Sequence, residues 1–352
     1  MHVSVENSKY TKVMRSSKAN SAPTISDVAQ LLRISRSTVS RAFTRPELLS
    51  VETVKSVHAA ATKLGYRPSL VARALSTGRH GNIAIVVPDI ANPFIPPLLR
   101  AAQAAADGAG FSLFLGDSDE DGVRESVLLE KLLLQADGAV IVGSRMTNDK
   151  IQEFAKRYPV VLVNNDSSGI PRVLIDTATG IDAAVTHLVE LGHKRLVYVC
   201  GPASSWSDQQ RRSAVKRAAK RLKITLEQIA APRPTFDAGK AVTAAVLKTK
   251  ATGAITFDDF VAYGLLAGLA ERSVVVPRDF SVIGCDDSLG GPAHLALTTI
   301  SSRCTDAGRI AVQMLLATLQ AGNKMDRRCV LDTKLLVRET TAKRPASTRH
   351  VE

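Results

Sequence analysis

The sequence has few cysteines, no long apolar run and no recognisable signal peptide. Its 352 residues include four cysteines, which are widely spaced and form no C-x-x-C pair. That spacing argues against a disulfide scaffold or a zinc site and favours a reducing cytosol. No apolar run approaches the ~18–20 residues of a membrane-spanning helix, and the first twenty residues lack an apolar core. We therefore expect a cytoplasmic protein that spans no membrane and holds no metal.

The common motifs of enzymes are also missing. The sequence contains no G-x-x-x-x-G-K-[ST], H-E-x-x-H or G-x-S-x-G motif. Gly108 and Gly110 lack the third glycine of a dinucleotide-binding loop and are expected to close a helix rather than open one. The paired aspartates at 258–259 and 286–287 have no recognisable nucleophile or base beside them. We expect no catalysis and no cofactor.

Charge divides the chain into two parts. Residues 1–80 contain 13 Lys and Arg against 4 Asp and Glu, whereas residues 81–352 contain 33 against 29. A basic head on a nearly neutral body indicates that the head meets a polyanion. Charge alone leaves DNA, RNA and an anionic membrane surface open as partners, and a solvated basic face remains the alternative.

The head has the pattern of three short helices after a polar leader, residues 1–22, that we expect to be disordered. Thr24 and Asp27 form a capping-box start, Ser35 caps a second helix, and a third follows Ser50 and ends at Gly65. A tight turn between the first two helices predicts a helix-turn-helix domain over 23–68, with the second helix in the major groove of DNA. A small amphipathic bundle without this function is the competing interpretation.

The exposed side chains of the second helix suit DNA. Arg36 and Arg41 carry the fork that matches guanine, and Ser37 is short enough to contact either type of base. Hydroxyls nearby suit phosphate, which positions a protein without reading sequence. The residues that we predict to contact DNA are Thr24, Ser35, Arg36, Ser37, Thr38, Ser40, Arg41 and Thr53, and in the next segment Ala72 and Leu75.

The segment 69–80 is the next distinctive stretch. LVARALSTGR is too short to be stable as an isolated helix. It combines the small Ala72 with the projecting Leu75, as do helices that insert an apolar wedge into the minor groove. A linker helix packed on the next domain is the alternative.

The body, 81–340, alternates apolar strands with helices. With 45% hydrophobic residues, the chain can bury a large core. Strands buried on both faces and separated by helices predict parallel doubly wound sheets, and there are too many for one sheet. We expect two α/β lobes with a cleft between them and a flexible tail, 341–352. The expected strands are 82–90, 111–117, 137–144, 159–166, 194–202, 253–259, 280–287 and 296–302.

Ligands in such folds bind beyond the carboxyl ends of the strands. The polar residues expected there include Asp89, Asn164, Asp258 and Asp286, with Phe236 as a nearby ring. Carboxylates and amides beside an aromatic ring suit a polyhydroxylated ligand. For each residue alone, a loop turn or a helix cap is the competing role.

Residues 24–78 resemble the DNA-binding region of the LacI/GalR family of bacterial transcription regulators. The stretches TISDVAQ, ISRSTVSRAF and RPSLVARALSTGR carry the resemblance, which extends over the body to about residue 340. Two positions depart from the family pattern. Arg33 stands where the family has a turn glycine, so that the turn is reshaped or Arg33 contacts phosphate, and Ser69 stands where the hinge helix begins with asparagine.

The resemblance implies a homodimer, a hinge helix at about 69–76 that orders on operator DNA with Leu75 inserted, and a small-molecule effector, sugar-like, bound between the core lobes. It implies effector contacts by Phe94, Asn164, Arg211, Phe236, Asp258 and Asp286. We therefore interpret the chain as an effector-responsive regulator of transcription, most simply a repressor. A sugar receptor and an enzyme on doubly wound domains are the competing functions, disfavoured by the basic head and by the missing catalytic residues.

Overall fold

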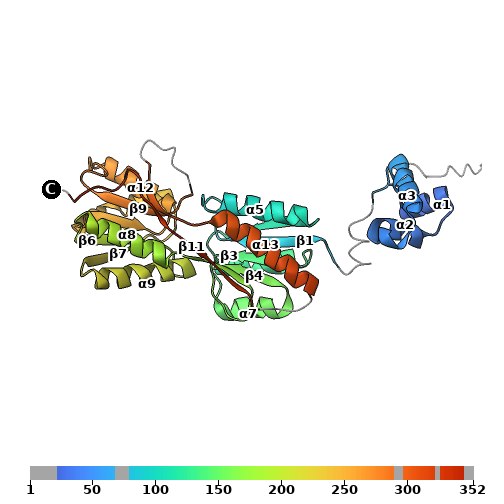
Figure 1. Cartoon of the computed structure of the whole chain (residues 1–352), viewed down its shortest axis with the longest axis horizontal. Helices are drawn as coiled ribbons and strands as arrows, with labels where there is room; N and C mark the ends of the chain where they lie inside the picture. Colours follow the sequence, from blue (N-terminus) through green and yellow to red (C-terminus); the bar gives the residue numbers. More distant parts are fainter. Residues whose placement is uncertain (1–21, 68–78, 289–295, 322–325, 345–352) are drawn as a thin grey trace, which may run out of the picture. The chain divides into compact units, whose positions relative to one another are not determined.

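The structure is a computed structural model that describes residues 22–67, 79–288, 296–321 and 326–344. Contacts divide the chain into two compact units, Met1–His80 and Gly81–Glu352, which we call the head and the core (Figure 1). Within the described ranges, no helix has the length and apolarity to cross a membrane. Each unit is described by itself.

The head is built from short helices around a small apolar centre. Its elements are α1 (Ile25–Leu32), α2 (Arg36–Thr44), a single 3-10 turn (Pro46–Leu48) and α3 (Val51–Leu64). Val28, Val39 and Val57, one from each α-helix, are fully buried against one another. This arrangement confirms the predicted helix-turn-helix fold.

The helix ends lie where the capping residues place them. The Asp27 carboxylate accepts hydrogen bonds from the Thr24 backbone N–H at 2.7 Å and from its hydroxyl at 2.8 Å. Ser35 Oγ accepts from the Thr38 N–H at 3.0 Å, and Ser50 Oγ accepts from the Thr53 N–H at 3.2 Å. Each cap satisfies a backbone N–H that the helix itself leaves without a partner.

The turn between α1 and α2 depends on Arg33. This residue has φ 54° and ψ 40°, in the left-handed region, and its N–H bonds the carbonyl of Gln30 at 3.3 Å. An L-amino acid such as arginine adopts this conformation at a cost of about 1–2 kcal/mol, which glycine avoids because it has no Cβ. The backbone therefore keeps the turn that glycine favours, although arginine occupies the position.

Within the described residues, the core forms two mainly parallel sheets, as predicted, and each of them has six strands. The first has the order β11-β5-β4-β3-β1-β2 and the second has the order β12-β10-β9-β8-β6-β7. Neighbouring strands are parallel, except for the antiparallel pair of β10 and β12. The first sheet comprises β1 (Asn82–Val87), β2 (Ser112–Asp117), β3 (Ala139–Val142), β4 (Val160–Val163), β5 (Arg172–Asp176) and β11 (Arg328–Asp332). The second comprises β6 (Arg195–Cys200), β7 (Thr225–Ala230), β8 (Gly253–Thr256), β9 (Ser281–Asp286), β10 (Thr298–Ser301) and β12 (Leu335–Leu336).

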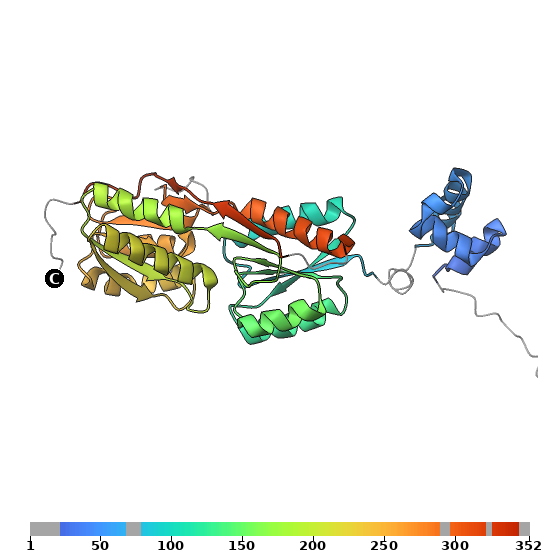
Figure 2. The same cartoon turned by 60° about the horizontal axis from the view of Figure 1, so that its bottom comes forward.

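Helices cover both faces of each sheet (Figures 1 and 2). The first lobe has α5 (Ile95–Gly108), α6 (Gly122–Leu133), α7 (Asn148–Arg157) and α13 (Cys304–Ala321). The second lobe has α8 (Ala178–Glu190), α9 (Trp206–Arg221), α10 (Phe236–Ala241), α11 (Thr243–Lys248) and α12 (Asp259–Ala270). Each lobe therefore has an apolar core on either side of its sheet.

The chain passes between the lobes three times. It leaves the first lobe after β5, returns to it after β10 to form α13 and β11, and ends in the second lobe with β12. In both views α13 lies beside α5 (Figures 1 and 2). A Cβ at Gly308 of α13 would lie 2.3 Å from the Leu98 carbonyl oxygen, so this close packing requires glycine. The lobes are thus tied by three connections.

The last described residues pack on the second lobe. His187 Nε2 lies 2.9 Å from Thr341 Oγ1, and His193 Nε2 lies 3.1 Å from the Ala342 carbonyl oxygen. Residues 341–344 of the expected flexible tail are therefore held by hydrogen bonds.

Candidate functional site

The second helix of the head presents the predicted base-reading residues to solvent. Arg36, Ser37 and Arg41 are exposed, whereas Ser40 is half-buried. Arg36 Nη1 lies 3.5 Å from Ser26 Oγ on α1, and Arg41 makes no ion pair within the described ranges. The guanidinium of Arg41 is therefore available to a ligand.

The predicted phosphate-contacting hydroxyls gather at two helix N-termini. Ser35 Oγ lies 2.7 Å from Ser37 Oγ and 2.8 Å from Thr38 Oγ1 at the start of α2. At the start of α3, Ser50 Oγ lies 2.8 Å from Thr53 Oγ1. Helix N-termini favour phosphate because their N–H groups and dipole face the anion. Ala72 and Leu75 lie outside the described residues.

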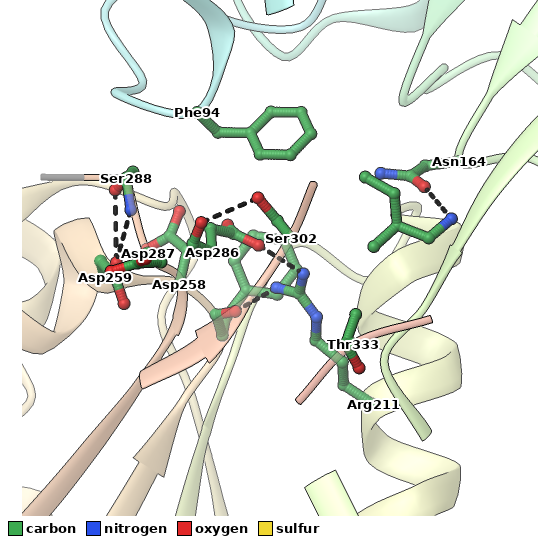
Figure 3. Close-up of polar contacts among 12 residues, drawn as sticks. Phe94, Asn164, Arg211, Asp258, Asp259, Asp286, Asp287, Ser288, Ser302 and Thr333 are labelled. Carbon is green, nitrogen blue, oxygen red and sulfur yellow. Dashed lines mark hydrogen bonds and ion pairs between the residues drawn. The ribbon is translucent and has the colours of Figure 1, made fainter. Parts of the chain in front are cut away.

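In the core, the ends of both sheets enclose one cleft between the lobes. Five of the seven predicted effector residues line it: Phe94 and Asn164 from the first lobe, and Arg211, Asp258 and Asp286 from the second. In Figure 3, the Phe94 side chain extends from the first lobe toward the group formed by Arg211 and the aspartates. The alternation of strands and helices predicted Asn164, Asp258 and Asp286 here because parallel strands end at the same edge of a sheet, whereas Phe94 and Arg211 were implied by the family resemblance.

Two predicted residues lie elsewhere. Asp89 is half-buried and its Oδ1 accepts a hydrogen bond from the Ala91 N–H at 2.8 Å, as in a loop turn. Phe236 begins α10 and packs against Phe260, with ring centroids 6.5 Å apart. Neither is among the residues that line the cleft.

Arg211 is the central charged residue of the cleft. Its side chain is 4% exposed, and its Nη2 donates to Asp286 Oδ1 at 2.9 Å. Nη1 donates to the Phe257 carbonyl oxygen, and the guanidinium lies 4.9 Å from the centre of the Phe257 ring. Nε is buried and has no hydrogen-bond partner among the described residues. An unpaired buried donor is costly, so a ligand oxygen at Nε would stabilise the site.

Asp258 joins the lobes across the cleft. Its Oδ1 accepts from the Val261 N–H at 2.9 Å and so caps α12, while its Oδ2 accepts from Asn92 Nδ2 of the first lobe at 2.9 Å. Burial, together with the nearby charge of Asp286, raises the pKa of Asp258 to about 7. Asp258 therefore caps a helix, contacts the other lobe and lines the cleft.

The cleft contains backbone in the left-handed region. Asn164, Asp286 and Asp287 have φ values of 54°, 111° and 49°. Asn164 Oδ1 accepts from the Ile175 N–H at 3.0 Å, and Figure 3 shows its amide nitrogen on the side that faces Phe94. Non-glycine residues in such conformations cluster at ligand sites. The strained backbone and the polar side chains coincide here.

Other polar residues also line the cleft, among them Asn92, Glu120 and Ser207, which were not predicted from the sequence. Asn92 lies between β1 and α5, Glu120 follows β2, and Ser207 is near the start of α9. Glu120 pairs with Arg145 at 2.5 Å, with both side chains buried. The signal for Glu120 is its place after the predicted strand 111–117, where the strand-end rule applies as it does to Asp89 and Asn164.

The cleft encloses about 60 Å³. Typical small-molecule sites measure about 300–1,000 Å³, so a sugar-sized ligand requires the lobes to separate or the lining side chains to move. Asn92 and Asp258, and the ion pair of Asp119 with Arg233, are the contacts that such a movement would break.

Known proteins share both units. Residues 24–69 match the family described as bacterial regulatory proteins, lacI family, and residues 185–341 match the periplasmic binding protein-like domain. Catabolite control protein A of Priestia megaterium is 30% identical over 302 residues, which cover 83% of this chain and 91% of that protein.

Two solved structures are similar in fold and sequence. The lac repressor dimer bound to operator and the anti-inducer ONPF has a TM-score of 0.82 at 25% identity, covering 92% of this chain and 100% of that chain. A LacI family transcriptional regulator from Enterococcus faecium with bound ribose has a TM-score of 0.67 at 27% identity, covering 74% and 99%. The chain therefore belongs to the LacI family of bacterial regulatory proteins, which are DNA-binding regulators of transcription rather than enzymes.

Proposed function

We propose that the protein is a cytoplasmic repressor that binds a palindromic operator as a homodimer and responds to a sugar or sugar derivative in the cleft of its core. The observation that carries the effector proposal is the buried Arg211–Asp286 pair beside Asp258, with an unpaired Arg211 Nε. Relatives support the same interpretation, since one of similar fold was solved with ribose and another with operator DNA.

The charges of the cleft favour a neutral ligand. Glu120 is paired with Arg145, and Arg211 with Asp286, each within one lobe. A strongly charged effector would have to break one of these pairs. Hydroxyl groups can instead donate to the carboxylates and accept from Arg211 Nε, while the Phe94 ring covers the apolar face of a sugar.

A thermal-shift screen of sugars, sugar alcohols and sugar acids on the full chain tests this proposal. A true effector should stabilise the core by an amount that grows with its concentration. Phe94→Ala is the appropriate variant, because Phe94 lines the cleft, is only half-buried, and its removal leaves the ion pairs of the cleft intact. It should reduce the stabilisation without lowering the melting temperature of the free protein strongly. A ligand whose effect is unchanged in Phe94→Ala binds elsewhere.

The proposed DNA contacts are centred on α2, where Arg36, Ser37 and Arg41 read bases. The hydroxyls proposed to contact phosphates are Ser35, Thr38 and Ser40 at or in α2, Thr24 before α1 and Thr53 on α3. Fluorescence anisotropy on operator-like and random duplexes at two salt concentrations separates these roles. Removal of a phosphate-binding group weakens binding to both duplexes and reduces the salt slope, whereas removal of a base-reading group affects the operator alone.

Coupling between effector and operator is proposed to pass through the segment 69–76, which lies outside the described residues. A helix of this length needs DNA, a partner subunit or the core to order it, and insertion of Leu75 costs a few kcal/mol of unstacking. Leu75→Ala should therefore weaken operator binding and reduce the effect of the sugar on it. Cleavage at Arg73 by trypsin should be blocked by operator DNA and not by random DNA.

A further inference from the structure

The amino ends of the strands in the second lobe form a strongly basic surface. Six residues define this basic end: Lys194, Arg195, Lys220, Lys223, Lys248 and Lys250. All six are exposed. They lie at the opposite edge of the sheet from the effector cleft, whose residues follow the carboxyl ends of the strands, at the side of the second lobe away from the first (Figure 1).

Backbone contacts bring three separate loops together at this end. The Lys194 carbonyl accepts from the Thr225 N–H at 3.0 Å, which places the end of α9, with Lys220 and Lys223, beside β6. The Arg195 carbonyl accepts from the Thr252 N–H at 3.1 Å, and Arg195 Nη1 donates to the Thr249 carbonyl at 3.5 Å. Lys248 and Lys250 flank Thr249 directly. The six positive charges therefore lie on one continuous surface.

The charge of this surface is uncompensated. None of the six side chains is in an ion pair within the described ranges, and the exposed acids near it are Glu190 and Glu227. Without these six residues, the sequence from 81 to 352 has 27 basic against 29 acidic residues. With Glu190 and Glu227 counted, the basic end has a net charge of +4, which equals the net charge of the whole sequence from 81 to 352.

The side chains at the basic end favour duplex DNA over other polyanions. The sequence stretches around it, 190–195, 216–225 and 244–252, contain no aromatic residue on which single-stranded bases could stack. They also contribute none of the exposed large apolar side chains of the described residues, which a membrane-surface site needs. Phosphates of a duplex require only lysine and arginine at suitable spacing.

We propose that the basic end of the core is a second, sequence-independent contact surface for duplex DNA, separate from the helix-turn-helix head. Its Lys and Arg side chains bind backbone phosphates and release counterions. The surface adds affinity for DNA in general without reading bases, so the protein has two regions that hold nucleic acid, one specific and one general.

The test uses the full chain with its base-reading residues removed, Arg36→Ala and Arg41→Ala, so that the contribution of the core becomes visible. The probe is a fluorescein-labelled random duplex of about 30 base pairs, titrated at several salt concentrations. In this background, changing Lys220, Lys223, Lys248 and Lys250 to glutamine should weaken binding at least tenfold at low salt. The slope of log K against log salt should flatten by about 0.9 for each phosphate that the variant no longer binds.

The matched control removes the same charge elsewhere. Arg124, Lys131, Lys156 and Arg157 are exposed on helices of the first lobe, and their change to glutamine should leave affinity and salt slope nearly unchanged. Equally weakened binding in the two quadruple variants would show an effect of net charge and overturn the proposal. An unchanged affinity in the basic-end variant would overturn it as well.

The same two variants decide between partners. Polyglutamate and vesicles that contain phosphatidylserine are tested in parallel with the duplex. If the basic-end variant fails to bind either of these and keeps its affinity for the duplex, the surface belongs to an acidic protein or a membrane and the DNA assignment is wrong. Thermal unfolding of both variants verifies that the core remains folded.

Discussion

The two candidate binding regions of this protein differ in how far their polar side chains are exposed. On α2 of the head, Arg36, Ser37 and Arg41 are exposed and contribute little to the apolar centre beneath them. In the core, Arg211, Asp258 and Asp286 are 4%, 2% and 7% exposed. Stability and recognition are therefore separable in the head, whereas the residues of the cleft also hold the core together.

The difference follows from the two kinds of ligand. DNA is larger than the head, so its phosphates and base edges must be met on an open surface. A small molecule is bound by enclosing it, and the polar groups that meet it must be buried and satisfied by one another. Substitutions in the cleft consequently need controls for folding that substitutions on α2 do not.

The largest effect is expected from Asp286→Ala. Removal of this carboxylate leaves the buried Arg211 guanidinium without its 2.9 Å partner, and breaking a buried ion pair costs about 3–5 kcal/mol. The melting temperature of the core should fall by roughly 6–20 °C, at about 2–4 °C for each kcal/mol. Calorimetry of the full chain without effector measures this shift.

A matched variant separates charge from shape. Arg211→Met with Asp286→Leu removes both charges and should restore much of the stability, because a buried pair can often be replaced by apolar residues without cost. Effector binding should be absent from both variants. A single Asp286→Ala variant that melts like the unchanged chain would show that Asp286 serves recognition alone and would break the comparison for the core.

The next effect is a dependence of stability on pH in the core. Burial is the main cause that raises the pKa of Asp258 to about 7 and of Asp259 to about 8, from an ordinary value of 3.8. At a pH between 3.8 and the raised pKa, each carboxyl keeps its proton in the folded protein and has released it in the unfolded chain. The stability that these two carboxyls contribute is therefore fully present below about pH 4. It decreases as the pH rises through 7–8, by up to about 1.4 kcal/mol per pH unit for each carboxyl.

Asp259→Asn isolates this contribution. An amide at this position can donate to the Thr299 hydroxyl and accept from the Ser288 N–H, the partners that the protonated carboxyl has now at 2.6 Å and 2.9 Å. Burial lowers the pKa of His187 and His193 from their ordinary value of 6.5. These two groups therefore make the stability rise with pH, and their effect is complete near pH 6.5. The difference between the unchanged chain and Asp259→Asn, followed by urea unfolding from pH 5 to 9, should grow with pH. A constant difference would contradict the raised pKa.

Local signals made much of this fold predictable. The caps at Thr24, Ser35 and Ser50 and the stop at Gly65 indicated the helices of the head, since each acts within one turn of its helix. Most of the buried strands were predicted from continuous apolar runs, but β5, which is buried from Arg172 to Ile175, was not. The strand-end rule then pointed to Asn164, Asp258 and Asp286, which line one cleft although they are up to 122 positions apart, whereas Phe94 and Arg211 were implied by the family resemblance.

Several elements that the sequence did not predict have positions that depend on residues far away in the sequence. The edge strand β7, TLEQIA, alternates polar and apolar residues and has no buried run. β12 has two residues and exists because it pairs with β10. The return of α13 to the first lobe depends on contact with α5, some 200 residues earlier in the sequence. No local pattern specifies such a pairing.

In the head, Arg41→Ala should reveal recognition without a change in stability. Arg41 is exposed and in no ion pair of the described residues, and a bidentate arginine contributes about 1–3 kcal/mol to discrimination between bases. The variant should bind the cognate operator more weakly by this amount and random DNA by much less, as measured by fluorescence anisotropy. Lys63→Ala, an exposed cation near the end of α3, is the matched control and should affect neither. An equal effect on both duplexes would make Arg41 a phosphate contact.

The smallest expected effect concerns Arg33, where an arginine holds the left-handed turn between α1 and α2. Glycine adopts the left-handed φ of 54° without the steric cost that arginine has there. Arg33→Gly should stabilise the head by about 0.5–1 kcal/mol after the larger entropy of glycine in the unfolded chain is subtracted. Amide hydrogen exchange of α1 and α2 in the full chain measures this gain.

Arg33→Ala completes the test, because it removes the same guanidinium and keeps a Cβ in the left-handed region. Its stability should match that of the unchanged chain, so the gain belongs to the backbone alone. Affinity for random DNA then reports on the guanidinium, since both variants lack it. An equal, salt-dependent weakening in the two variants would give Arg33 a phosphate contact, in which case the strain at this turn is offset by DNA binding. If the free energy of unfolding rises in both variants, the cost at Arg33 comes from its side chain rather than from its φ. The turn would then hold no backbone strain that glycine relieves.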